Sequence, residues 1–158
     1  MPVAARPGQL VAYRSYRDLY QSVPEQYFTV QRQTTGGSGN EALVATLVRP
    51  AGRSIQEQLL ALHRSRPDDS LASLLPDVSV ARTTVDSSKC RPIAVRIDAL
   101  SRVTLFVPTR DLIILHPVVH RILIDIGPAT IDATILDDSA ELARWAVDTA
   151  VAIQRCTG

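Results

Sequence analysis

The sequence predicts an α+β fold: an antiparallel sheet of about five to seven strands, with a short helix inserted at residues 54–66 and a long helix at residues 139–155. Three observations support this prediction. Several segments alternate apolar and polar residues, which is typical of half-buried strands. Glycine and proline separate these segments, as they do at turns. The two helical segments instead place apolar residues three and four positions apart.

Length and composition favour a single domain that spans residues 1–158. The chain has 158 residues, of which 46% are hydrophobic. This is enough to bury one core and is short for two. Pro2, Pro7 and Gly8 interrupt the first residues. We therefore expect residues 1–8 to form an irregular N-terminal arm.

The longest apolar and β-branched stretch, residues 111–136, predicts the central strands. Ile122 and Ile124 alternate with charged neighbours, and the alternation resumes at Ile131 after the turn dipeptide Gly127-Pro128. A period of two on both sides of a turn predicts a hairpin.

Other segments predict further strands. Residues 26–34 and 41–49 alternate, and the five residues 36–40, GGSGN, join them as a hairpin tip. Residues 77–85, 92–100 and 103–107 are also interpreted as strands. Residues 9–23 fit a short amphipathic helix and an edge strand equally well.

The two helices have recognisable starts. Ser54 and Glu57 have the spacing of a capping box before the first helix, and Pro67 ends it. Residues 70–75 could add one more turn. For the last helix, Asp138 is the predicted cap, with Glu141 three positions later.

Two cysteines, Cys90 and Cys156, are too few for a disulfide-framed secreted domain. They could pair if the last helix packs close to Cys90, but buried free thiols are the more usual state in a chain of this size. No leader-like segment and no stretch of ~18 apolar residues occurs. We therefore expect a soluble protein without a membrane partner, in a reducing compartment or in an assembled particle.

The charge distribution gives weak support for contact with nucleic acid. Residues 1–66 hold eight arginines and four acids, whereas residues 67–158 hold nine basic and twelve acidic residues. Arginines can bind phosphates on a strand surface. The candidate residues are Arg32, Arg49, Arg53, Arg64 and Arg66. The acids on the later strands and the low aromatic content, 4%, argue against this function.

His116 and His120 are the candidate residues for chemistry. They lie four positions apart in HPVVH, a metal-binding spacing when the backbone is helical. Pro117 and two valines disfavour a helix, and on a strand the two residues lie ~13 Å apart. Asp111 or Asp125 could complete a site if the chain bends. A small metal-dependent or acid/base enzyme that uses these histidines and a nearby carboxylate is thus the alternative function.

The function that the sequence favours is a non-catalytic, self-associating structural subunit, such as a coat or other assembly protein, with other copies of itself as partners. No motif is specific for a reaction, and we expect no cofactor. The last helix carries a stripe of small residues, which suits close packing between copies, and the edges of the predicted sheet are the other expected contact between copies. The predicted interface consists of Leu142, Trp145, Ala146, Ala150 and Ile153.

Overall fold

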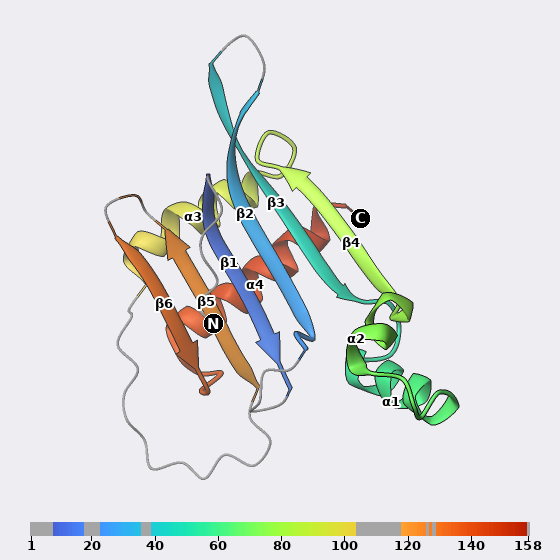
Figure 1. Cartoon of the computed structure of the whole chain (residues 1–158). Coiled ribbons are helices and arrows are strands. Elements are labelled where there is room, and N and C mark those ends of the chain that lie inside the picture. Colours follow the sequence, from blue (N-terminus) through green and yellow to red (C-terminus); the bar gives the residue numbers. More distant parts are fainter. Residues whose placement is uncertain are drawn as a thin grey trace.

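The computed structural model describes residues 8–17, 23–35, 39–103, 118–125, 127 and 129–157. These residues form one six-stranded antiparallel sheet, and two of the helices lie on one face of it (Figure 1). The sheet order is β4-β3-β2-β1-β5-β6. This arrangement confirms the predicted α+β fold. The strands are β1 Gln9–Tyr16, β2 Gln26–Thr35, β3 Asn40–Pro50, β4 Val80–Asp86, β5 Val119–Asp125 and β6 Thr130–Ile135.

Both predicted hairpins are confirmed. β2 pairs with β3, and β5 pairs with β6, each in antiparallel register. In the segment 9–23, Gln9–Tyr16 form strand β1, which lies between β2 and β5. It is therefore a central strand, whereas the predicted alternatives were a helix and an edge strand. The predicted arm before Gly8, the predicted strand at residues 103–107 after its first residue, and residues 111–117 of the apolar stretch lie outside the described residues.

The predicted strand at residues 92–100 is wrong, because this segment forms helix α3, Arg91–Ala99. Ile93 is fully buried, whereas Val95 is 56% exposed. The apolar residues that matter are therefore Ile93, Ile97 and Leu100, which follow a helical period. Pro92 lies in the first turn of the helix, where its missing N–H is not needed. The short 3₁₀ segment Leu100–Arg102 continues α3.

The inserted helix is confirmed as α1, Ile55–Ser65, and a second short helix, α2 Leu71–Leu74, follows it. Ser54 and Glu57 form the predicted capping box: the Ser54 hydroxyl accepts the Glu57 N–H at 3.2 Å, and Glu57 accepts the Ser54 N–H at 3.0 Å. Figure 1 shows α1 and α2 beyond the ends of β3 and β4, away from the other helices.

The last helix is α4, Glu141–Arg155. The prediction that Asp138 caps it is wrong, because the N-cap is Ala140, which makes no side-chain cap bond. α4 packs with α3 on one face of the sheet (Figure 1). Trp145 anchors this layer, since its indole N–H donates to the Arg96 carbonyl at 2.8 Å and its ring lies 6.4 Å from that of Phe28.

Cys90 and Cys156 form a disulfide with a Cα–Cα distance of 5.7 Å, so the expectation of free thiols is wrong. Cys90 precedes α3 and Cys156 follows α4, and the packing of these two helices brings the thiols together. In the described part of the chain, no helix is long and apolar enough to cross a membrane.

Candidate functional site

The segment that connects β3 to β4, residues 51–79, carries three exposed leucines. Within it only Ile55 and Leu74 are buried. Leu60, Leu71 and Leu75 are 51%, 44% and 39% exposed. We call these three residues the leucine surface. A patch of this kind on a soluble domain commonly marks a contact site for another protein.

A shallow groove of about 240 Å³ lies beside the leucine surface. Leu60 and Leu71 line it from α1 and α2, and Val23 lines it from the segment before β2. Arg17 and Glu25 add one charge of each sign. Exposed leucines and a largely apolar groove thus lie together on this segment.

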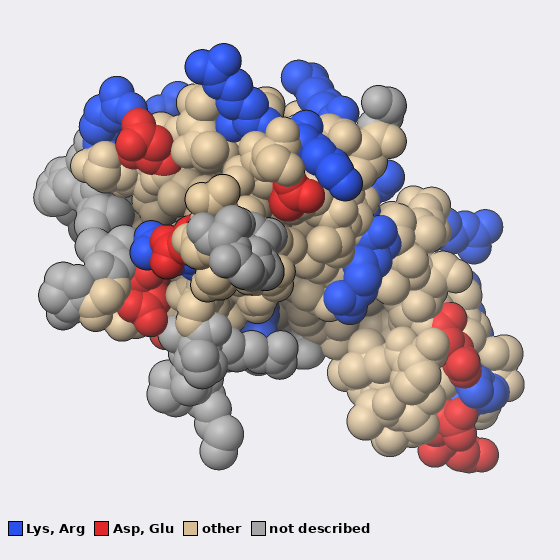
Figure 2. All heavy atoms as spheres, turned by 90° about the horizontal axis from the view of Figure 1, so that it is seen from above, with Lys and Arg blue, Asp and Glu red and all other residues tan. Residues whose placement is uncertain are grey.

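Charges on this segment are mixed and nearly balanced. Residues 51–79 hold three arginines and four acids. Arg66 contacts Asp77 at 2.5 Å and Asp69 at 3.5 Å. In Figure 2 the segment is the lobe at the right, where uncharged atoms dominate and charged atoms gather along the outer edge. A surface with both signs at its rim does not repel a second copy of itself.

The predicted interface on the last helix lies inside the subunit. Its five residues face the chain's own sheet and α3, and none is more than 5% exposed. These side chains are therefore not available at the surface for a contact with a second copy. The buried set comprises Leu142, Trp145, Ala146, Ala150 and Ile153.

The buried His120 joins Tyr13, in the core, to Asp138, whose side chain is 70% exposed. The Nδ1 atom of His120 lies 3.0 Å from the Tyr13 hydroxyl, and its Nε2 atom lies 2.5 Å from the Asp138 carboxylate. A carboxylate accepts hydrogen bonds, so the tautomer that fits Asp138 has its proton on Nε2. In this tautomer, Nδ1 accepts a hydrogen bond from the Tyr13 hydroxyl group. Cross-strand pairing places Ser15 opposite His120 and thereby fixes its position.

The hydrogen bonds among Tyr13, His120 and Asp138 join strand β1, strand β5 and the segment before α4. His120 is 3% exposed, and both of its ring nitrogens already have partners. Burial raises the pKa of Tyr13 to about 12; the Ser15 hydrogen bond opposes this rise, and the negative charge of Asp138 adds to it. A phenol with that pKa stays protonated near neutral pH and is a weak proton donor.

The other half of the predicted metal site, His116, lies outside the described residues, as does Asp111. Asp125 accepts the backbone N–H of Gly127 at 3.1 Å and so holds the turn between β5 and β6. Among the residues that the structure describes, no three His, Cys, Asp or Glu side chains are arranged to hold a metal ion.

The five arginines predicted to contact nucleic acid are spread over several elements. Arg32 lies on β2 and pairs with Glu41 at 3.5 Å. Arg49 is half-buried on β3, and its Nε atom is buried without a hydrogen-bond partner. Arg53 and Arg64 are exposed at opposite ends of α1, and Arg66, just after α1, is paired with two acids.

A different set of arginines lies in one row across the sheet face opposite the helices. Strand register joins Arg82 to Val48, Val48 to Tyr27, Tyr27 to Arg14, and Arg14 to Arg121. Arg121 is paired with Asp132 at 3.2 Å, which raises the pKa of the guanidinium. The sequence shows each arginine at an outward position of an alternating strand, but only the strand order shows that they share a row.

Comparisons with known proteins identify no relative, since no family, no curated protein and no solved structure matches the chain.

Proposed function

We propose that the protein is a non-catalytic, self-associating subunit whose copies meet through the leucine surface. The observation that carries this proposal is the exposure of Leu60, Leu71 and Leu75 on a helical segment that buries only Ile55 and Leu74. Short helices gain most of their stability from packing an apolar face. A second copy would supply that packing partner.

A second copy fits this surface better than a strongly charged partner does. The segment holds three arginines and four acids, so it has no dominant sign to attract a polyanion or a polycation. In a two-fold arrangement the leucines of one copy face the groove of the other. Sheet edges were the other predicted contact. Both edge strands, β4 and β6, carry a charge at the centre, Arg82 and Asp132, which disfavours edge pairing.

The test is the mass of the particle in solution. Sedimentation of the full chain over a concentration series should show an oligomer that dissociates on dilution. The double substitution Leu60→Glu with Leu71→Glu places charges in the contact and should raise the dissociation constant by at least about 100-fold, since each buried leucine contributes about 1.5 to 3 kcal/mol.

Val95→Glu is the matched control, because Val95 is 56% exposed but lies on α3, outside the proposed contact. This variant should sediment as the wild type does. A wild-type chain that is monomeric at every concentration would overturn the proposal. Equal dissociation constants for the double leucine variant and Val95→Glu would also overturn it. The absorbance ratio at 260 and 280 nm in the same runs reports whether nucleic acid accompanies the particle.

A further inference from the structure

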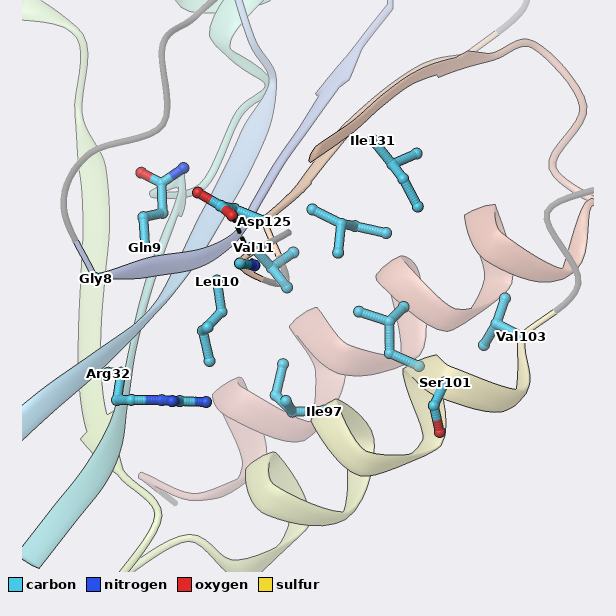
Figure 3. A pocket seen from close by; sticks show the side chains of 13 residues that line it. Gly8, Gln9, Leu10, Val11, Arg32, Ile97, Ser101, Val103, Asp125 and Ile131 are labelled. Carbon is cyan, nitrogen blue, oxygen red and sulfur yellow. Dashed lines mark hydrogen bonds between the residues drawn. The ribbon is translucent and has the colours of Figure 1, made fainter. Parts of the chain in front are cut away.

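A second pocket, unrelated to the leucine surface, lies between the sheet and α3. Its volume is about 620 Å³, which is within the range of small-molecule sites. Figure 3 shows side chains converging on it from two sides. Val11 and Ile131 lie on the sheet side, and Ile97 and Val103 lie on the helical side.

The lining determines the class of ligand. The apolar side chains that surround the space are all aliphatic: Leu10, Val11, Ile97, Leu100, Ile124 and Ile131 are among them. No aromatic ring of the described residues lines it, so stacking cannot hold a flat base or ring. Aliphatic walls favour an aliphatic ligand, because burying its chain removes apolar surface from water without requiring polar partners.

One end of the pocket supplies a positive charge. Arg32 extends from β2 toward the space (Figure 3). Its pairing with Glu41 is weak, since the atoms are 3.5 Å apart and both side chains are more than half exposed, at 53% and 58%. A ligand carboxylate at the mouth can therefore take the place of Glu41. A guanidinium matches a carboxylate well, because two parallel N–H groups bind its two oxygens.

Two other polar groups of the lining have structural partners. Asp125 accepts the Gly127 N–H at 3.1 Å, and the Ser101 hydroxyl donates to the Asp98 carbonyl at 2.9 Å. Gln9 also lines the pocket, and the negative charge of Asp125 favours a position for a ligand carboxylate at Arg32, away from Asp125.

We infer that this pocket binds a long-chain carboxylate, with its alkyl chain between the sheet and α3 and its carboxylate against Arg32. This inference goes beyond self-association, and it concerns a different part of the molecule. The leucine surface and the pocket share no residue.

Calorimetric titration of the full chain with dodecanoate, below its micelle concentration, tests the inference. Dodecanoate should bind saturably, and dodecanol should bind about ten-fold more weakly. Arg32→Gln should raise the dissociation constant for dodecanoate about ten-fold and leave that for dodecanol unchanged. Arg64→Gln, at an exposed arginine of α1 outside the pocket, should change neither value.

Variants that fill the pocket provide a second test of the inference. Ile131→Trp, on edge strand β6, and Ser101→Trp, at an exposed position, each place a large ring in the space. At least one of these variants should fold, as judged by circular dichroism, and should bind dodecanoate at least ten-fold more weakly. Absence of saturable binding to the wild type would overturn the inference. So would unchanged binding by a folded filling variant, or equal binding of dodecanoate by Arg32→Gln and wild type.

Discussion

At the scale of single residues, the Tyr13–His120–Asp138 chain shows how the fold accommodates a buried imidazole. His120 is 3% exposed, and an unpartnered polar group at that depth costs about 1 to 3 kcal/mol. The Tyr13 hydroxyl and the Asp138 carboxylate satisfy its two ring nitrogens. Tyr13 also packs against Phe28, with ring centroids 5.1 Å apart, so the polar chain begins inside the aromatic core.

The raised pKa of Tyr13 predicts a loss of stability at high pH. Burial moves it from 10.0 to about 12. Between these values the unfolded phenol releases its proton while the buried phenol keeps it, so the unfolded state binds fewer protons and stability falls as pH rises. The loss attributable to Tyr13 should be about 0.4 kcal/mol at pH 10 and reach about 2 kcal/mol by pH 12. Urea unfolding at a series of pH values measures it.

Tyr13→Phe should remove this part of the pH dependence, and it should also lower stability by about 1 to 2 kcal/mol at neutral pH because His120 loses a partner. Tyr27→Phe is the matched control, since Tyr27 is only half-buried and lies on the other face of the sheet. If the Tyr13→Phe and wild-type chains lost stability in parallel above pH 10, the explanation by burial would be wrong.

The role of Asp138 shows what sequence reasoning could not reach at this scale. Its position three residues before Glu141 fits a helix cap, which is a local rule. The structure uses it instead as the partner of His120, eighteen residues away. The pairing of β5 with β6 sets His120 opposite Ile135, three residues before Asp138, and so brings the carboxylate beside the imidazole.

At the scale of elements, helix α1 is held to the sheet through its first turn. The Glu25 carboxylate accepts the Ile55 N–H at 3.0 and 3.1 Å, although the two residues are thirty positions apart. The capping box satisfies further N–H groups. Hydrogen bonds from Ser54, mainly from its side chain and also from its backbone, lower the pKa of Glu57. The local capping box and the distant Glu25 carboxylate therefore both hold the first turn of the helix that carries Leu60.

Removal of the distant cap should loosen α1 and leave the sheet intact. In Glu25→Ala, the Ile55 N–H loses its acceptor and the first turn loses a favourable negative charge. The free energy of local opening of α1 should fall by about 1 to 2 kcal/mol. Amide hydrogen exchange measures this quantity residue by residue.

Glu41→Ala supplies the comparison, because Glu41 is an exposed acid on β3 whose pairing with Arg32 does not involve α1. Exchange in α1 should be unchanged in that variant. Equal protection of α1 amides in the Glu25→Ala and wild-type chains would show that the carboxylate does not hold the helix.

The sequence of helix α3 fits both the two-residue period of a strand and the 3.6-residue period of a helix. In residues 92–100 the apolar residues satisfy both an alternating and a helical spacing, and the strand interpretation placed Val95 beside Ile93 and Ile97. The structure follows the helical spacing and leaves Val95 exposed. Pro92 favours that outcome, since proline fits the first turn of a helix but cannot donate to a central strand ladder. Over so few residues, tertiary packing selects the period.

At the scale of the whole molecule, local patterns predicted the hairpins and both main helices but not the strand order. Each hairpin is encoded by neighbouring residues and a turn. The pairing of β1 with β5 joins residues more than a hundred positions apart, for example Tyr13 and Ile122, and depends on how the two hairpins meet. The row of Arg82, Arg14 and Arg121 and the aliphatic pocket arise from that pairing, so neither could be predicted from sequence.

The Cys90–Cys156 disulfide should contribute to the stability of the entire fold. It joins the start of α3 to the end of α4 across a sequence separation of 66 residues, so it restricts a large part of the unfolded chain. A loop of this length corresponds to about 4 kcal/mol in the chain-entropy description, and measured effects of native disulfides are typically about 2 to 4 kcal/mol. Reduction should therefore lower the urea midpoint by roughly 1 to 2 M for a protein of this size.

The measurement is urea unfolding at one fixed protein concentration, with and without a phosphine reductant, because association would make the midpoint depend on concentration. The Cys90→Ala, Cys156→Ala double variant should unfold near the reduced wild type and be insensitive to the reductant. That insensitivity separates the effect of the bond from any effect of the reductant on the rest of the chain. A wild-type midpoint that does not move on reduction, with free thiols verified by titration, would mean that α3 and α4 hold their positions through the core around Trp145 and Ile93 alone.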